Sequence, residues 1–290
     1  MIRTCEIMKV STEIGSIAKI IGEEKAVEYV AKAGFDAWDF SMFRMCITRQ
    51  GELVSDNDHP LAGKNYAEFA RKLRKIGEDN GIICNQTHAP FPTKYEAVRS
   101  YIERALECTA IVGAEICVVH PQNLLSAEEN AEMYREFLVD AHKYGVKIAT
   151  ENMWCWDGEK DESSPAACSF AEDFCRHIDV VNDDYFVACL DIGHAEMRGS
   201  SDGAAYTIRA LGDRLQALHI HDNDQWKDSH AIPFSMKVDF EEIVRALKDI
   251  NYKGYLTLEA TRYIENFTEE NAFEGVKDLY NAVDRMRKMF

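Results

Sequence analysis

The sequence has little of what marks several large classes of protein. No apolar run approaches the roughly 20 residues that a membrane-spanning helix needs. The opening MIRTCEIMKV lacks the apolar core of a secretory signal, so we expect a cytoplasmic protein without a membrane partner. No GxGxxG or P-loop motif follows a strand-like run, which leaves a nucleotide-binding fold with little support.

Positive charge is also scarce. The chain has 50 acidic and 33 basic residues, a net charge of −17, and no stretch rich in Lys and Arg. Because such a chain repels a polyanion at long range, nucleic acid is not expected as its main partner. The nine cysteines contain no CxxC pair and are odd in number, a pattern typical of reduced, mostly buried thiols.

The chain instead alternates strand-like and helix-like segments eight times without a linker or a low-complexity break. Alternation of this kind predicts a parallel sheet, and 290 residues fit a barrel that runs to ~250 residues or more as one domain. We therefore predict a single (β/α)₈ TIM barrel over residues 1–290. The predicted strands are residues 6–11, 35–42, 82–88, 115–120, 146–151, 185–191, 216–221 and 254–259.

Several helix boundaries are also predicted from capping residues. Gly34, Gly81, Gly113 and Gly145 each stand just before a strand, as left-handed C-caps do, and Ser126 and Asp239 resemble N-caps. The predicted helices include residues 23–33, 66–80, 95–112, 127–144, 240–250 and 272–289. Long loops at residues 43–63, 152–169 and 222–237 are expected to wall a site.

Ionisable side chains close six of the strand-like runs. A single such residue is more often a hydrogen-bonded core or loop residue, but a parallel barrel brings every strand's carboxyl end to one face. Burying so many ionisable groups together without a cation would cost several kcal/mol per unpaired charge. The pattern therefore predicts a metal centre at the carboxyl ends of the strands, formed from His88, His120, Glu151, Asp191, His219 and Glu259.

Five short motifs at these strand ends resemble a known family, the xylose isomerase-like barrels. They are TEN at 150–152, LDIGHAE at 190–196, LHIHDND at 218–224, DSH at 228–230 and LTLEA at 256–260. Each motif is weak alone, but their order and spacing span nearly the whole chain. The family comprises sugar and sugar-phosphate isomerases and epimerases, together with the apurinic-site nucleases of the endonuclease IV type.

The resemblance to the epimerases implies one divalent metal held by Glu151, Asp191, His219 and Glu259. An oxygen-rich set with one imidazole suits Mn²⁺, Mg²⁺ or Co²⁺, and Zn²⁺ also fits. The metal would polarise a sugar carbonyl, and Glu151 and Glu259 would act as the catalytic acid and base. The expected partner is a small-molecule sugar or sugar phosphate. The expected substrate-binding residues are His88, His120, His194, Asp228, His230 and Trp154.

The chain departs from the ketose 3-epimerases at Gln225, where those enzymes carry an arginine, so the sugar stays open. The sequence also leaves open whether the sugar is phosphorylated, whether the reaction is an epimerisation, an isomerisation or a dehydration, and whether the chain forms a homo-oligomer. A barrel that binds metal and sugar without catalysis would not need both glutamates. The main alternative is an endonuclease IV-like trinuclear zinc site, because His88, His120, His194, Asp228 and His230 match its further ligands. His221 is interpreted as pointing away from His219.

Overall fold

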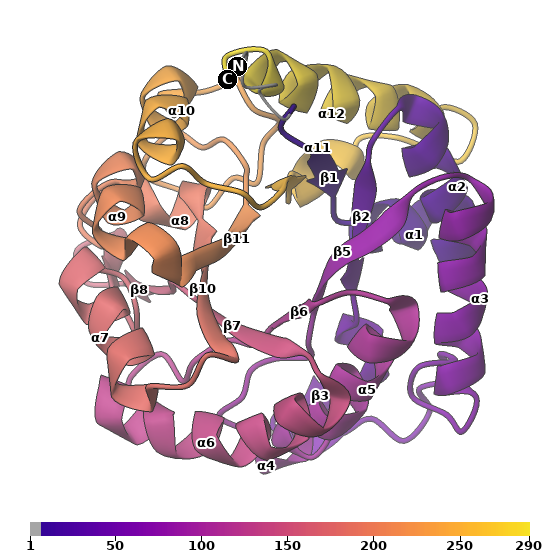
Figure 1. Ribbon diagram of the computed structural model, residues 1–290, viewed down its shortest axis with the longest axis horizontal. Helices are drawn as coiled ribbons and strands as arrows, with labels where there is room; N and C mark the ends of the chain where they lie inside the picture. The colour runs from indigo at the N-terminus through magenta and orange to yellow at the C-terminus, as the bar shows by residue number, and fades with distance from the viewer. Residues whose placement is uncertain (1–6) are drawn as a thin grey trace, which may run out of the picture.

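The computed structural model describes residues 7–290, which form a closed barrel of parallel strands inside a ring of helices (Figure 1). Six strands make one sheet in the order β11-β10-β7-β6-β5-β2, and β1 pairs with β12. Parallel bridges from Glu13 to Asp39 and from Ile220 to Leu258 join the two sheets at both edges. The predicted (β/α)₈ barrel is thereby confirmed.

The barrel strands agree with the predicted ones to within a few residues. They are β1 (Val10–Thr12), β2 (Ala37–Ser41), β5 (Ile83–His88), β6 (Ile116–Val118), β7 (Lys147–Glu151), β10 (Phe186–Asp191), β11 (Leu215–His219) and β12 (Leu256–Leu258). Part of the first predicted strand, residue 6, lies outside the described residues. His120 and His221 follow their strands by two residues, so each lies in a loop at the barrel mouth.

The helices of the described chain alternate with the strands. They are α1 (Gly15–Ile21), α2 (Glu23–Ala33), α3 (Tyr66–Asp79), α4 (Glu96–Arg99), α5 (Ile102–Val112), α6 (Ala127–Tyr144), α7 (Ala171–Val181), α8 (Ile192–Ala195), α9 (Ala204–Leu211), α10 (Phe240–Asp249), α11 (Thr261–Ile264) and α12 (Ala272–Arg287). The single helix predicted over 95–112 is wrong in one respect, because α4 and α5 are separate helices.

The predicted caps explain where several helices begin and end. Ser126 forms a full capping box with Glu129 at the start of α6, and Asp239 accepts two backbone N–H bonds at the start of α10. Gly34, Gly113 and Gly145 end α2, α5 and α6 in the left-handed conformation. Local sequence therefore sets where these helices begin and end, and each helix returns the chain to the start of the next barrel strand.

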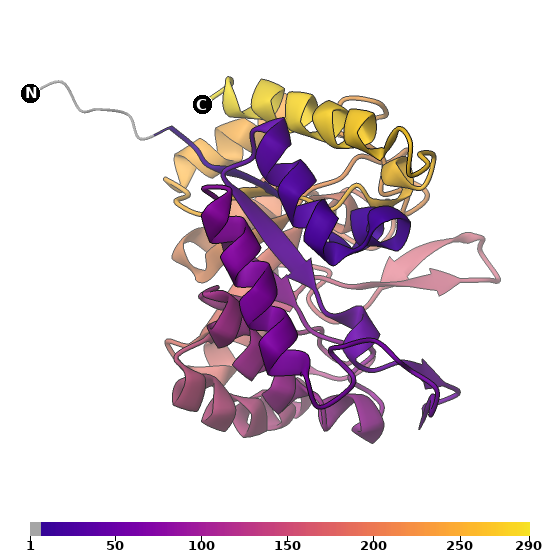
Figure 2. The same ribbon diagram turned by 90° about the vertical axis from the view of Figure 1, so that its right-hand side faces the viewer.

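Two hairpins extend the loops that follow β2 and β7. One is formed by β3 (Thr48–Arg49) and β4 (Glu52–Leu53), and the other by β8 (Trp154–Asp157) and β9 (Glu162–Pro165). Figure 2 shows both hairpins projecting from the side toward which the arrow of β2 points. The carboxyl ends of the strands are therefore walled, as the long loops predict.

The barrel interior is divided into an apolar part and a polar part. Small apolar side chains from β6, β7, β10 and β11 form one cluster: Val118, Ala149, Val187, Cys189 and Ala217. On the β1, β2, β5 and β12 side, the interior instead contains hydrogen-bonded polar residues. A register shift lets β5 supply two consecutive polar side chains there, because Asn85 is the extra residue between the partners of Trp38 and Asp39.

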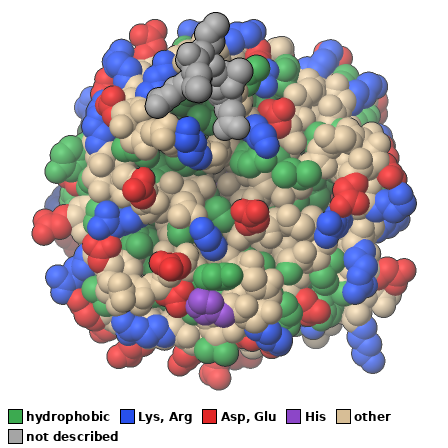
Figure 3. Space-filling view, viewed as in Figure 1, with side chains coloured by type: hydrophobic (Ala, Val, Ile, Leu, Met, Phe, Trp, Pro, Cys, Tyr) green, Lys and Arg blue, Asp and Glu red, His purple; other side chains and the backbone are tan. Residues whose placement is uncertain are grey.

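The surface carries charges of both signs. On the face seen in Figure 3, Lys and Arg side chains are interspersed with Asp and Glu, and the described part of that face has no continuous basic patch. Within residues 7–290, no helix combines the length and apolar character needed to cross a membrane. The cysteines of this range are all free.

Candidate metal centre and active site

Four of the predicted ligands meet at the carboxyl end of the barrel. Glu151, Asp191 and His219 are the last residues of β7, β10 and β11, and Glu259 follows β12 directly. Each offers a ligand atom, and these atoms all lie within 4.8 Å of one another. All four residues are buried. The strand register therefore brings together side chains that are up to 108 residues apart in the sequence (259 − 151).

Asn152 and the start of α8 hold Asp191 in place. The Asn152 side chain accepts a hydrogen bond from the Asp191 N–H at 2.7 Å and donates one to the Asp191 carbonyl at 3.0 Å. The Asp191 carboxylate in turn caps α8 by accepting the His194 N–H at 2.7 Å. One carboxylate oxygen of Asp191 is thus fixed by the backbone. The other, Oδ2, has no hydrogen-bond partner in the described chain.

The charges of this cluster are unbalanced. Within residues 7–290, the ion pairs of Glu151, Asp191 and Glu259 involve only histidines, with no Lys or Arg. Asp191 Oδ2 is buried without a hydrogen-bond partner in the described chain, and Glu151 Oε2 makes no well-aligned hydrogen bond although His120 Nε2 lies 3.0 Å away. A cation would neutralise the site and give both atoms a ligand, because unpaired buried charges cost several kcal/mol. The residues present therefore fit a divalent metal.

The pKa values of these carboxyl groups reflect two opposing effects, burial and the neighbouring histidines. Burial raises the pKa of Glu259 to about 8, although His219 and His230 oppose the change. Burial also acts to raise the pKa of Glu151, but the neighbouring His219 and His120 hold it well below its usual range. For Asp191, His194 and His221 likewise outweigh burial and lower the pKa. Without a metal, the neighbouring histidines are what favours the ionised form of these carboxyl groups.

His88 and His120 lie beside Glu151. Their Nε2 atoms are 2.8 Å apart, and His120 Nε2 is 3.0 Å from Glu151 Oε2. Burial and the nearby His120 hold the pKa of His88 well below its usual value. His88, Glu151 and His219 also form a second set of ligand atoms close enough to hold one ion.

A further group lies on the other side of Asp191 and contains three of the predicted substrate-binding residues, His194, Asp228 and His230. His194 Nε2 is 3.5 Å and His230 Nε2 is 3.2 Å from Asp228 Oδ2. Burial lowers the pKa of His230, but Asp228 and Glu259 raise it overall, to about 9. The same group includes His221, and its ligand atoms also lie within 4.8 Å of one another.

His221 was predicted wrongly. A strand period of two puts residues 219 and 221 on the same side, not on opposite sides. His221 is fully buried, its Nε2 lies 3.1 Å from Asp191 Oδ1, and its ring stacks on His230 at 3.9 Å. Gly193 makes room for it, because a Cβ at residue 193 would lie 1.9 Å from the His221 ring.

The buried carboxylate of Asp222 shapes the loop that carries Asp228 and His230. Asp222 accepts the backbone N–H groups of Met236 and Val238 at 2.8 and 3.0 Å. Its own backbone pairs with Ala231. These bonds fold the loop back over the barrel mouth and so bring the DSH motif to the site.

Sequence reasoning missed two acidic residues below the site. Asp39 on β2 is fully buried, and its Oδ2 lies 3.2 Å from His219 Nε2. Glu13, just after β1, is buried beside it and accepts the Ser16 N–H at 3.0 Å. Burial raises the pKa of both carboxyl groups. The alternation of Ala37, Asp39 and Ser41 along β2 is the signal that could have placed Asp39 inside the barrel.

Aromatic rings surround the mouth. Trp154 on β8 is half-buried, with its ring 6.4 Å from that of His194, whereas Trp156 is 46% exposed farther along the hairpin. Sequence reasoning missed two further rings. The ring centroid of Phe91 lies 4.6 Å from that of His120, and the ring centroid of Phe43 lies 4.7 Å from that of His88. An apolar ring face can pack against the C–H face of a sugar.

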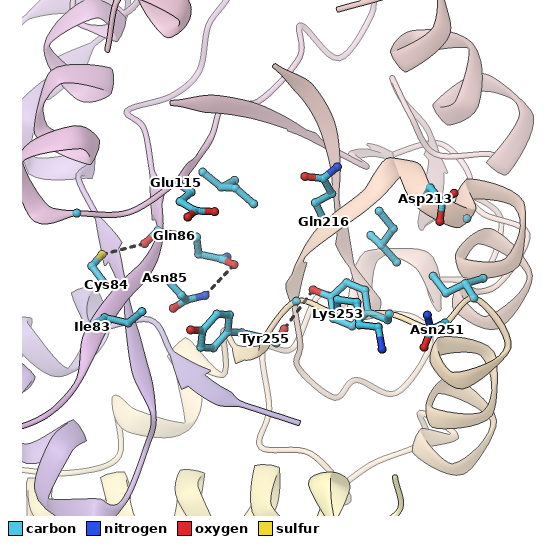
Figure 4. Close-up of a pocket in the computed structure, with 17 residues that line it drawn as sticks. Ile83, Cys84, Asn85, Gln86, Glu115, Asp213, Gln216, Asn251, Lys253 and Tyr255 are labelled. Carbon is cyan, nitrogen blue, oxygen red and sulfur yellow. Dashed lines mark hydrogen bonds between the residues drawn. The ribbon is translucent and has the colours of Figure 1, made fainter. Parts of the chain in front are cut away.

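A cavity of about 490 Å³ lies at the opposite, amino end of the strands (Figure 4). Its lining includes Asn85, Glu115, Gln216, Tyr252 and Tyr255. The labelled side chains of Asn85, Glu115, Gln216 and Tyr255 approach from different segments around an open centre. None of the four predicted metal ligands lines it. The cavity and the candidate metal centre are therefore separate features of the barrel.

Comparisons with known proteins agree with this architecture. A family model described as xylose isomerase-like TIM barrel matches residues 27–284. The protein MJ1311 of Methanocaldococcus jannaschii is 27% identical over 256 residues, which cover 81% of this chain and 78% of that protein. It is similar along most of its length.

Solved structures share the fold at low identity. The IolI protein with a bound zinc atom superposes with a TM-score of 0.72 at 18% identity, covering 98% of this chain and 99% of that one. D-Psicose 3-epimerase with D-tagatose, from Clostridium cellulolyticum H10, gives 0.69 at 17% identity, covering 97% and 99%. Both likenesses are to the barrel as a whole.

Proposed function

Because the chain belongs to the xylose isomerase-like TIM barrel family, we propose that it is a metal-dependent sugar isomerase or epimerase. One observation carries the proposal: Glu151, Asp191, His219 and Glu259 converge within 4.8 Å in a buried cluster whose acids pair with no Lys or Arg in the described chain. The epimerase and zinc-bound structures that share this fold add support.

The four residues would hold one divalent cation, Mn²⁺, Co²⁺, Mg²⁺ or Zn²⁺. When bound, the cation supplies Lewis-acid polarisation of a sugar carbonyl and so acidifies the adjacent C–H. The two glutamates come from β7 and from the end of β12, so their carboxylates approach the site from different strands. One carboxylate would remove the carbon-bound proton, and the other would return a proton to the same or the neighbouring carbon.

The remaining residues would bind the sugar. His88 and His120 offer ring N–H and nitrogen atoms to hydroxyl groups on one side, and His194, His230 and Asp228 offer theirs on the other. Trp154 would cover the apolar face of the sugar and exclude water. Because imidazoles can both donate and accept hydrogen bonds, a site rich in histidine suits a polyhydroxylated ligand better than a purely acidic site would.

A test starts with metal analysis and turnover in D₂O. We expect purified protein to hold one divalent metal per chain and to introduce deuterium at the reacting carbon of a sugar drawn from a panel of ketoses and aldoses. Glu151→Gln and Glu259→Gln should each remove the exchange. A protein that binds none of the four cations would contradict the proposal. Turnover without label would indicate hydride transfer instead.

The endonuclease IV-like alternative has one observation in its favour. Two further sets of ligand atoms flank the central one, namely His88 with Glu151 and His219, and His194 with His221, Asp228 and His230. Against it stands the net charge of −17, because phosphate contacts by Lys and Arg supply much of the affinity for DNA. We expect one metal rather than three zinc ions. Nicking of an abasic duplex that His230→Ala abolishes would favour the nuclease.

A further inference from the structure

Asp39 is a buried carboxylate in direct contact with one of the proposed metal ligands. It lies on β2, on the far side of His219 from Glu151, and its side chain is fully buried. Its Oδ2 is 3.2 Å from His219 Nε2, and the opposite ring nitrogen, Nδ1, lies 2.8 Å from Glu151 Oε1. The imidazole of His219 thus bridges Asp39 and the metal centre.

The polar residues of the barrel interior determine which hydrogen-bond donor faces Asp39. Ser11 donates to Asn85 Oδ1 at 2.6 Å, which leaves the Asn85 amide to donate to Gln86 Oε1 at 3.2 Å. Thr257 donates to the same Gln86 oxygen at 3.3 Å. The Leu218 carbonyl, which can only accept, lies 3.3 Å from Gln86 Nε2 and fixes the orientation of this amide, so its NH₂ also faces Asp39 Oδ2 at 3.1 Å.

This chain of bonds determines which nitrogen of His219 carries hydrogen. When Asp39 is ionised, its Oδ2 can only accept, from Gln86 and from His219, so Nε2 carries the hydrogen. A hydrogen on Asp39 Oδ1 would find no acceptor, because that atom has no hydrogen-bond partner in the described residues. In the metal-loaded protein, His219 would then be protonated at Nε2 and would offer the Nδ1 lone pair toward Glu151 and Glu259.

We propose that Asp39 is a positioning residue that holds His219 as a metal ligand through Nδ1, with Gln86 fixing the orientation of Asp39. The inference rests on the proposed function, since it takes His219 to be a ligand. A carboxylate that accepts the second N–H of a ligating histidine sets the tautomer and ring orientation, and it raises the basicity of the ligand. Asp39 therefore contributes to metal affinity without touching substrate.

Asp39→Asn and Asp39→Ala test the role, with Glu13→Gln as the matched control. Glu13 is also a buried carboxylate and directly follows the neighbouring strand β1, but it is bonded to Ser16 and Ser41 rather than to His219. The measured quantity is the dissociation constant for Zn²⁺ and for Mn²⁺, from competition with a chelator. We expect about tenfold weaker binding for Asp39→Asn and up to about 100-fold for Asp39→Ala. Glu13→Gln should bind as wild type does.

A second measurement separates positioning from a structural role. The urea midpoint of the metal-free proteins should be the same for Asp39→Asn and wild type, whereas a structural role would lower it in step with the metal affinity. The inference is overturned if Asp39→Asn binds metal as tightly as wild type, if Glu13→Gln loses as much affinity, or if the metal-free midpoint falls. Wild-type protein that binds neither cation would instead overturn the proposed function itself.

Discussion

The two ends of the barrel both collect polar side chains, but only one of them keeps buried side-chain oxygens that make no hydrogen bond in the described residues. At the carboxyl end, buried oxygens of Glu151, Asp191 and Asp228 have no hydrogen-bond partner in the described residues. At the amino end, no side chain that lines the cavity has such an atom, and Gln216 accepts a bond from Lys147 at 2.8 Å.

The comparison shows what a concave surface does and does not reveal. The amino-end cavity is a distinct hollow, yet none of its lining side chains keeps a buried polar atom without a hydrogen bond. We place the proposed chemistry at the carboxyl end because several ionisable groups lie there at ligand distance, and its acids pair with no Lys or Arg in the described residues. Unsatisfied buried groups persist in a native structure when a ligand or a function requires them. Functional evidence in this barrel therefore comes from charge and pairing rather than from cavity volume.

The largest expected effect follows from removing one catalytic carboxylate. Glu259→Gln should lower kcat by roughly 10²- to 10⁴-fold, the usual contribution of a positioned acid or base. Gln216→Ala at the amino end should leave kcat near that of wild type. Both are measured as the initial rate of deuterium incorporation into the sugar found to react. Equal losses in the two variants would remove the functional difference between the ends.

Removal of the metal should give the next largest effect. At a free metal concentration 1,000 times its dissociation constant, binding stabilises the native state by about 4 kcal/mol. Chelation should therefore lower the melting temperature by roughly 10 °C. Gln216→Ala should show the same shift as wild type, since the amino end holds no ligand of the ion. An unchanged melting temperature after complete removal of the metal would argue that the carboxyl end balances its own charge.

Gly193→Ala should disturb the carboxyl end through packing alone. The new Cβ would lie 1.9 Å from the His221 ring, so either the ring or α8 must move. Overpacking of this kind costs about 1–3 kcal/mol in the free energy of unfolding, measured by urea denaturation. Gly158→Ala is the matched control, because nothing lies within 4 Å of a Cβ there. Similar stabilities for the two variants would mean that the His221 position is not tightly packed.

Trp154→Ala should have the smallest effect. Loss of a stacking surface at the mouth should raise KM about tenfold, equivalent to about 1.4 kcal/mol, with little change in kcat. Trp156→Ala, on the exposed part of the same hairpin, should change KM less. If Trp156 proves the more important of the two, the sugar lies farther out than the ring of His194.

Local sequence predicted the order of the elements and most of their ends. The caps at Ser126 and Asp239 and the left-handed glycines depend on interactions within a few residues, so they are visible in the sequence. The break between α4 and α5 was not predicted, because residues 95–112 keep a helical pattern throughout. The predicted ligands Glu151, Asp191, His219 and Glu259 lie close together because strand ends of a parallel barrel meet on one face.

The sequence by itself determined the barrel, and it gathered Glu151, Asp191, His219 and Glu259 at strand ends through the alternation of apolar runs and helices. Only the tertiary structure decided which further groups surround them. His221 joins the site because Gly193 leaves space for its ring, and Asp39 reaches His219 because β2 closes the barrel across from β11. Such contacts depend on the register between strands far apart in the chain, and local sequence patterns do not contain it.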